Sequence, residues 1–266
     1  MESDATSNAA LITFPPSLDS ELGRFLLRHY GVPHREERHA FIFASCATLW
    51  HGGTVIFPFF YDESTRLAGP RAIADYFDTR CAPDLRLWPR TVEEKQQVEN
   101  DWRQFNQSLA FATAVFAYYH LLPHRELMIE PLSSGAPEFE RKAVKRAYPV
   151  FAGLLKILLR LNAQHAAQSL DLIRTIFTAV ETRLAEGGQY LVGSLLTLSD
   201  LAFSVAAAPV VLPANYGGPI PPFDQMPPEV QAVVKETRAR PAGAFALRIY
   251  QECRDRFGGS PTHGSD

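Results

Sequence analysis

Hydrophobic and polar positions follow two different patterns along this chain. Between residues 11 and 80, short β-prone runs alternate with amphipathic helical segments in the order strand, helix, strand, helix, strand, strand, helix. The main segments are residues 11–14, 20–30, 34–39, 40–51, 54–61 and 70–80. Strands that alternate with helices indicate a sheet with a parallel component that helices cover.

Pro58 interrupts the strongest strand pattern, residues 54–61. Proline removes a ladder N–H, so a strand tolerates it only at a sheet edge, at a bulge or beside a cis bond. Only about 5–6% of X–Pro bonds are cis in folded proteins, so the residues alone do not indicate a cis bond here.

Helical periodicity dominates from Val92 to the end of the chain. The predicted helical stretches are residues 91–120, 138–162, 169–186 and 228–256, with Pro241 as a candidate break in the last. Pro- and Gly-rich connections separate them at residues 121–137 and 213–228. The sequence therefore predicts two domains, an α/β domain over residues 10–82 and an all-helical domain over residues 90–257.

Two predicted helices begin in contrasting ways. The helix with Ile73, Tyr76 and Phe77 on one face starts at Gly69-Pro70, where Ser, Thr, Asp or Asn is the usual cap. Glycine is tolerated at the cap and proline is favoured at the first helical position, so this start is structurally benign. Thr197 to Asp200 instead form a variant of the capping box, worth about 1 kcal/mol.

Composition is that of an ordinary globular protein. The 266 residues are 46% hydrophobic and 21% charged, and the net charge of −3 gives no electrostatic footprint for nucleic acid. The three cysteines form no C-x-x-C pair, which favours a reducing compartment. No signal peptide and no membrane-spanning run is visible, so we expect a cytoplasmic protein without a membrane partner.

His120 and His124 have the four-residue spacing of metal ligands on one helix face. Pro123 lies between them, however, and no third ligand is close in the sequence. We therefore expect no metal site.

Several motifs together resemble the cytosolic glutathione transferase family, over nearly the whole chain. They are SLDSELGR at 17–24, Phe57-Pro58, RAIADYF at 71–77, YLVGSLLTLSD at 190–200 and RARPAGAF at 238–245. The resemblance implies a thioredoxin-like N-terminal domain followed by an all-α C-terminal domain, usually in a homodimer. It also implies glutathione as cosubstrate and a cis bond before Pro58.

The resemblance assigns roles to particular residues. Ser17 would be the catalytic residue, because a hydroxyl donor at a helix N-terminus favours the thiolate of glutathione. Its alternative role, or that of Ser20, is to cap the first helix, and Ser20 suits the cap better because it is nearer the periodic segment. The peptide N–H and C=O of Phe57 would contact the cysteinyl part of glutathione, and His51 its glycyl carboxylate.

Gly69-Pro70 departs from the family's pattern. Relatives have Glu or Gln followed by Ser here, and these residues hold the ammonium and carboxylate of the γ-glutamyl group. Gly69 offers no side chain, and Pro70 offers neither a hydroxyl nor an N–H. Arg71 could still contact the carboxylate. Glutathione binding is therefore expected to be weakened or altered in mode, and restoring Glu-Ser is expected to cost little stability.

Two functions remain open from the sequence. The first is a glutathione transferase-like enzyme whose activated thiol attacks a small-molecule apolar electrophile between the domains, with peroxidase or isomerase activity as variants. The alternative is a non-catalytic transferase fold used as a binding or assembly module. The aromatic run Phe105, Phe111, Phe116, Tyr118 and Tyr119 is mostly core, and part of it should line the electrophile's cleft.

Overall fold

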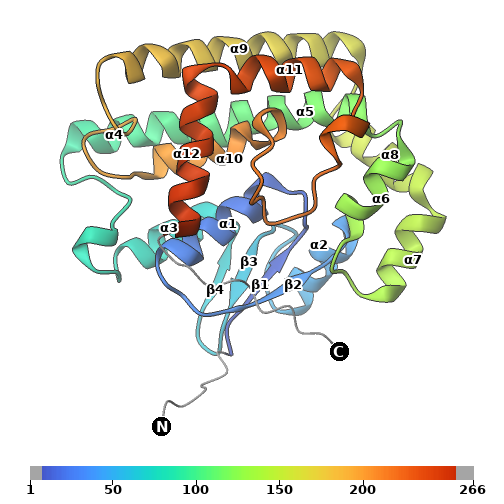
Figure 1. The fold of residues 1–266 in the computed structure, drawn as a ribbon. Helices are drawn as coiled ribbons and strands as arrows, with labels where there is room; N and C mark the ends of the chain where they lie inside the picture. Colours follow the sequence, from blue (N-terminus) through green and yellow to red (C-terminus); the bar gives the residue numbers. More distant parts are fainter. Residues whose placement is uncertain (1–7, 256–266) are drawn as a thin grey trace.

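The computed structural model describes residues 8–255, a small sheet with its helices packed against a larger set of helices (Figure 1). The sheet has the strand order β2-β1-β3-β4, in which β1 is parallel to β2 and antiparallel to β3, and β3 is antiparallel to β4. The strands are β1 (Ala10–Thr13), β2 (Arg35–Arg38), β3 (Phe59–Tyr61) and β4 (Arg66–Ala68). This is the mixed, thioredoxin-like sheet that the sequence predicts.

Strand β3 is shorter than the predicted run of residues 54–61, because regular pairing begins only after Pro58. The Phe57-Pro58 bond is cis, as the resemblance implies. Proline has no N–H for the ladder, so the strand cannot extend through it. The carbonyl of Pro58 instead accepts the N–H of Gly69, at 2.8 Å.

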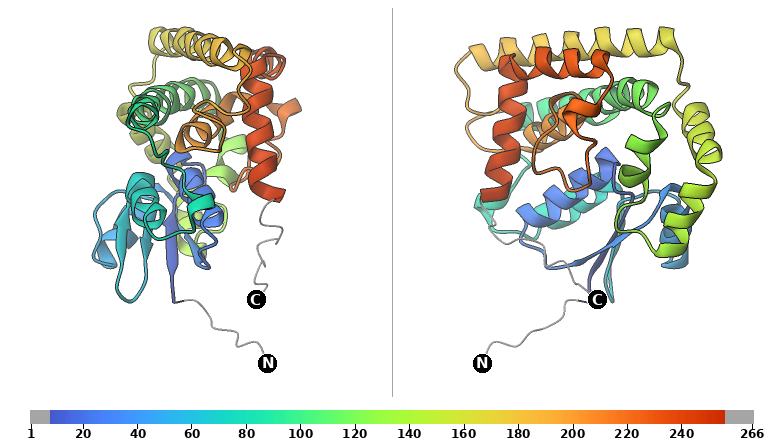
Figure 2. Two further views of the ribbon diagram at one scale, coloured as in Figure 1. Left: turned by 90° about the vertical axis from the view of Figure 1, so that its left-hand side faces the viewer. Right: turned by 45° about the vertical axis from the view of Figure 1, so that its right-hand side comes forward.

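Three helices accompany the sheet: α1 (Leu18–His29), α2 (Phe41–Trp50) and α3 (Gly69–Asp78). Helix α1 packs against α3 and lies between the sheet and the C-terminal helices (Figure 2). A Cβ at Gly23 of α1 would lie 2.7 Å from Cγ of Pro58. Only glycine therefore lets α1 come this close to the segment that holds the cis proline.

The C-terminal part is all-helical. Its elements are α4 (Val92–Trp102), a π-helical turn (Arg103–Leu109), α5 (Ala110–Leu121), α6 (Arg125–Ser133), α7 (Glu138–Arg146), α8 (Tyr148–Leu158), α9 (Ala163–Ala185), α10 (Leu198–Val211), α11 (Pro228–Arg238) and α12 (Pro241–Asp255). Helix α10 is buried along almost its whole length and contacts α1, α4, α5, α11 and α12. Helix α9 runs along the side farthest from the sheet (Figures 1 and 2). Among residues 8–255, no helix has the length and apolar character that a membrane crossing requires.

Proline positions explain where the helices differ from the predicted stretches. Residues 138–162 form two helices instead of one, because Pro149 opens α8 at a position where no N–H is needed. The predicted connection at 121–137 contains α6, which keeps Pro131 inside the helix because Met128 and Leu132 are buried in the core. Pro241 does divide the last stretch, into α11 and α12. The predicted end of the second domain, residue 257, lies outside the described residues.

The predicted capping box opens α10. The carboxylate of Asp200 accepts the N–H groups of Thr197 and Leu191, both at 2.7 Å, and the Thr197 hydroxyl at 2.8 Å. All of these groups are buried. Burial raises the pKa of Asp200 to about 6, although the hydrogen bonds oppose the shift.

Candidate functional site

Ser17 is the N-cap of α1. Its Oγ accepts the N–H of Ser20 at 3.3 Å, and its own N–H donates to the Phe14 carbonyl at 3.0 Å. The preference of the sequence for Ser20 as the cap is wrong, because the helix begins directly after the Pro15-Pro16 turn, one turn before its apolar face. Ser20 is fully buried and accepts the N–H of Phe14, so its hydroxyl does not reach a ligand.

The hydroxyl hydrogen of Ser17 is free. Within the described residues its Oγ acts only as an acceptor, and the side chain is partly exposed. Ser17 therefore offers an O–H donor at a helix N-terminus, where the partial positive charge of the helix also favours an anion.

Asp19, in the first turn of the same helix, is a residue that the sequence interpretation missed. Burial raises the pKa of its carboxyl to about 6, and a contact with the side chain of Asn106 partly opposes this. Asn106 belongs to the π-helical turn between α4 and α5, which the sequence predicted as continuous α-helix. The sequence did show an acidic residue in the first turn of this helix. Its burial, however, comes from the packing of α1 against the C-terminal part, which the sequence does not reveal.

The peptide group of Phe57 is unpaired. No residue between 8 and 255 hydrogen-bonds its N–H or its C=O, while its ring packs edge-on against Phe14 and Phe41 at 5.8 and 5.9 Å. An unpaired donor and acceptor beside a strand end can bind the backbone of an extended peptide. This is the contact that the resemblance assigns to Phe57.

Gly69 and Pro70 are both buried at the start of α3. Gly69 has φ = +81°, a conformation that residues with a side chain rarely adopt. The interpretation of Gly69-Pro70 as an ordinary, freely exchangeable helix start is therefore wrong for Gly69. Its conformation follows from the turn out of β4, where its N–H reaches back to Pro58.

The guanidinium of Arg71 is engaged by neighbouring acids. It binds Glu99 of α4 through two nitrogens, at 2.6 and 3.0 Å, and Asp75 through Nε at 2.8 Å. It also lies 4.6 Å from the ring of Trp88. Arg71 thus joins α3 to α4, and its donors are directed at protein carboxylates.

His51 lies at the other end of the sheet from Ser17. Its ring stacks on Tyr61 at 4.2 Å, and Tyr61 pairs with Ala10, the first residue of β1. Ser17 follows Thr13, the last residue of β1. Three strand residues separate these ends by about 10 Å. The fold therefore brings Ser17 and Phe57-Pro58 to one end and places His51 at the opposite end.

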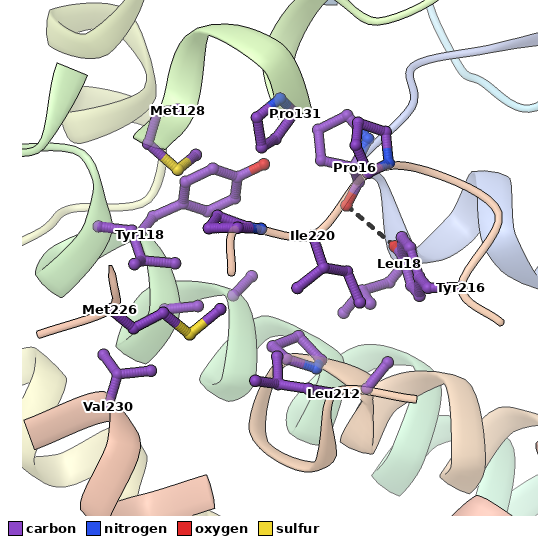
Figure 3. Close-up of a pocket in the computed structure, with 17 residues that line it drawn as sticks. Pro16, Leu18, Tyr118, Met128, Pro131, Leu212, Tyr216, Ile220, Met226 and Val230 are labelled. Atoms are coloured by element: carbon purple, nitrogen blue, oxygen red, sulfur yellow. Dashed lines mark hydrogen bonds between the residues drawn. The ribbon is translucent and has the colours of Figure 1, made fainter. Parts of the chain in front are cut away.

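An apolar cavity of about 90 Å³ lies between the two domains, and both chain neighbours of Ser17 line it (Figure 3). Pro16 and Leu18, the neighbours of Ser17 in the chain, form one wall. The rest comes from α5, α6, α10, α11 and the loop after α10, through Tyr118, Met128, Pro131, Pro209, Tyr216, Ile220, Met226 and Val230 among others. Of the predicted aromatic run only Tyr118 lines it: Phe105 and Phe116 are in the core, and Phe111 is exposed.

The loop after α10 covers the cavity and is tied to the N-terminal domain. The Tyr216 hydroxyl donates to the Pro16 carbonyl at 3.2 Å, and the N–H of Gly217 donates to both carboxylate oxygens of Glu21 at 3.0 Å. Arg38 donates to the Gly217 carbonyl at 3.0 Å. The sequence indicated an irregular loop here but not that it forms a wall of the site.

Within residues 8–255 no cluster of three His, Cys, Asp or Glu side chains is arranged to hold a metal ion. His120 is the C-terminal basic residue of α5, and His124 lies at the N-cap of α6. The two histidines therefore belong to different helices instead of one helix face.

Solved structures of glutathione S-transferases resemble this chain over most of its length. A glutathione S-transferase from Sinorhizobium meliloti 1021 aligns with 91% of this chain and 93% of its own, at a TM-score of 0.56 and 18% identity. The β-etherase LigF from Sphingobium sp. strain SYK-6 aligns with 91% of this chain and 99% of its own, at a TM-score of 0.56 and 13% identity. FzlA from C. crescentus aligns with 90% of this chain and 92% of its own, at a TM-score of 0.54 and 15% identity.

No protein-family model and no curated protein matches the sequence itself. At these low identities the structural likeness establishes the fold. The chain has the glutathione S-transferase fold, a thioredoxin-like domain followed by an all-helical domain, as its motifs predict.

Proposed function

We propose that this chain is a glutathione transferase-like enzyme. Ser17 stabilises the thiolate of glutathione, which attacks an apolar electrophile held in the cavity between the domains. The observation that carries the proposal is the free hydroxyl hydrogen of Ser17 at the N-terminus of α1, between two residues that line the cavity.

The chemistry requires a lower thiol pKa. A free thiol has a pKa near 8.5, and the thiolate is the nucleophile. A charge-assisted hydrogen bond of about 1.5–3 kcal/mol lowers that pKa by roughly one to two units. The free N–H and C=O of Phe57 would hold the cysteinyl backbone, so that its sulfur reaches Ser17. Peroxide reduction, isomerisation and ether cleavage could use the same thiolate.

Calorimetric titration of glutathione tests binding, and substitution of Ser17 tests its role. Ser17→Ala removes both the donor and the cap, so it should slow conjugation at neutral pH and cost about 1 kcal/mol of stability. Ser17→Asp keeps the cap acceptor but has no proton to donate at pH 7, so it should retain stability and still lose activity. Thr91→Ala removes a comparable cap on α4, away from the cavity, and should leave activity unchanged.

The direct readout is the pKa of the bound glutathione thiol, measured from thiolate absorbance against pH. This pKa should be higher in both Ser17 variants than in the wild-type protein. An unchanged thiol pKa and rate in both variants would remove Ser17 from the mechanism.

The second candidate function is a non-catalytic binding or assembly module, and the start of α3 favours it. Gly69 has no side chain, Pro70 has no N–H, and Arg71 is occupied by Glu99 and Asp75. The γ-glutamyl end of glutathione would then find few partners. Absence of heat in the glutathione titration, together with no thiol transfer, would favour this function.

A further inference from the structure

Helix α8 is apolar on two opposite faces. Tyr148 and Leu155 are buried against the protein. The face opposite them carries aliphatic side chains at the spacing i, i+4, i+7 and i+8, which places them on one side of a helix. We call this set the α8 stripe, and its members are Val150, Leu154, Ile157 and Leu158.

The α8 stripe faces open space. Ile157 is 75% exposed and Val150 is 68% exposed. A Cβ at Gly153, in the middle of the same side, would meet no atom within 4 Å. A surface helix normally turns polar side chains to the solvent, and an exposed apolar patch of this kind marks an interaction site.

The stripe lies in strongly basic surroundings. Residues 141–170 contain no Asp or Glu, although the chain as a whole has a net charge of −3. The same stretch holds six cationic residues, which are Arg141, Lys142, Lys145, Arg146, Lys156 and Arg160. The positive charge is therefore local to α7 and α8, which lie together at one margin of the molecule (Figures 1 and 2).

Most of these cations are not neutralised by the protein. Glu138 lies 3.6 and 3.7 Å from the side-chain nitrogens of Arg141 and Lys142. The other four are exposed, and no carboxylate within residues 8–255 forms an ion pair with them. Phe139, 63% exposed on α7, adds a large apolar side chain to this margin.

The two properties together limit what can cover the face. A symmetric contact with a second copy through α8 would bring the cations of both copies together, and like charges repel. A nucleic acid would satisfy the cations through its phosphates but would not bury an aliphatic stripe. An anionic lipid surface offers both, because phosphates lie directly above an apolar layer.

We propose that α8 docks on the surface of a bilayer that contains anionic phospholipid. The α8 stripe enters the boundary between headgroups and acyl chains, and Lys156, Arg160 and the cations of α7 contact the headgroups. The sequence-based expectation of no membrane partner depended on the lack of a spanning run, and a helix that lies on a bilayer needs none.

The first test is co-sedimentation of the full chain with phosphatidylcholine vesicles that do or do not contain phosphatidylserine. Binding should be at least about tenfold stronger to the vesicles with phosphatidylserine, since each cation near an anionic surface contributes roughly fivefold. High salt should weaken it, because salt screens exposed charges. Absence of binding to these vesicles, or equal binding to both kinds, would overturn the proposal.

Paired variants locate the contact. Ile157→Gln should lower the partition coefficient about tenfold by removing apolar burial, and Lys156→Gln should lower it about fivefold. Val92→Gln and Lys95→Gln are the controls on α4, which lies on the other side of the molecule in Figure 1. Val92 is 76% exposed and Lys95 is also exposed, so both controls should bind like the wild type.

Binding by Ile157→Gln equal to that of the wild type would place the contact elsewhere and overturn the role of α8. Sedimentation velocity of the wild type and Ile157→Gln tests the competing occupant. A wild-type dimer that Ile157→Gln dissociates, without vesicle binding by either protein, would make the α8 stripe an interface between copies of this chain.

Discussion

The backbone N–H of Gly217 donates to both carboxylate oxygens of Glu21, at 3.0 Å. Glu21 is buried on α1 and also pairs with Arg24 at 2.8 Å. Burial raises the pKa of Glu21, and the charge of Arg24 opposes this. The contact fixes the loop that covers the cavity to the helix that begins beside Ser17, so the cover and the candidate nucleophile site share one anchor.

Gly217→Ala should loosen this anchor. A Cβ at Gly217 would lie 2.6 Å from Oε2 of Glu21 and from Cδ of Arg24, so either the loop or this buried ion pair has to shift. We expect a loss of about 1–3 kcal/mol of stability and faster proteolytic cleavage in the loop. Gly153→Ala on α8 is the control, because a Cβ there meets no atom within 4 Å and alanine favours the helix. Equal stability and cleavage rates in the two variants would show that Gly217 is not an anchor.

Gly69→Glu should be destabilising. Its φ of +81° costs a residue with a side chain of the order of 1–3 kcal/mol. The double change to Glu-Ser, expected from the sequence to be nearly neutral, is therefore expected to lower the melting temperature. Thermal unfolding of Gly69→Glu and Gly69→Ala checks this, and both should show the cost because both have a Cβ.

Pro70→Ser isolates the binding effect from that strain. It supplies a hydroxyl and an N–H at the start of α3, the groups that would hold a γ-glutamyl carboxylate. If glutathione binds in the family's mode, calorimetry should show roughly tenfold tighter binding, the equivalent of about 1.4 kcal/mol. An unchanged dissociation constant would count against that mode.

Asp200→Ala should be among the most destabilising single changes. It leaves the buried N–H groups of Leu191 and Thr197 without acceptors, at about 1–3 kcal/mol each. Thr91→Ala, which removes an exposed cap, should cost only about 1 kcal/mol. Denaturant unfolding of the two variants measures the difference, and a loss at Asp200 no larger than that at Thr91 would contradict the capping role.

Asp19 should make the stability of the protein fall as pH rises through the mildly acidic range. Its pKa in the folded state, about 6, lies above its ordinary value of 3.8. The unfolded chain therefore loses this proton first, and the contribution of Asp19 to stability is present below about pH 4 and lost by about pH 6. The change is at most about 1.4 kcal/mol per pH unit.

Asp19→Asn removes this titration. Its free energy of unfolding relative to the wild type should rise between pH 4 and pH 6.5, while Asp200 contributes equally to both proteins and cancels. A constant difference across this range would mean that the carboxyl of Asp19 titrates alike in the folded and unfolded chain.

Local patterns were enough to predict much of the fold. The strand at β1, the edge strand β2, the capping box at Thr197 and the break at Pro241 each depend on residues close in sequence, and each is present. The motifs added what periodicity could not, the cis bond before Pro58 and the likeness of the fold to glutathione transferases. Ser17 was also selected from its motif, although Ser20 was preferred to it as the cap.

The site depends on contacts between distant residues, and these only the tertiary structure decided. Gly217 and Glu21 are 196 residues apart, and Arg71 and Glu99 are 28 apart, so no local pattern relates them. Gly69 adopts its left-handed conformation where the chain leaves β4, and there its N–H donates to the carbonyl of Pro58, just before β3. Tyr118 looked like any other aromatic residue of an amphipathic helix. Only the packing of α5, α6 and the loop after α10 makes it part of the wall of an apolar cavity.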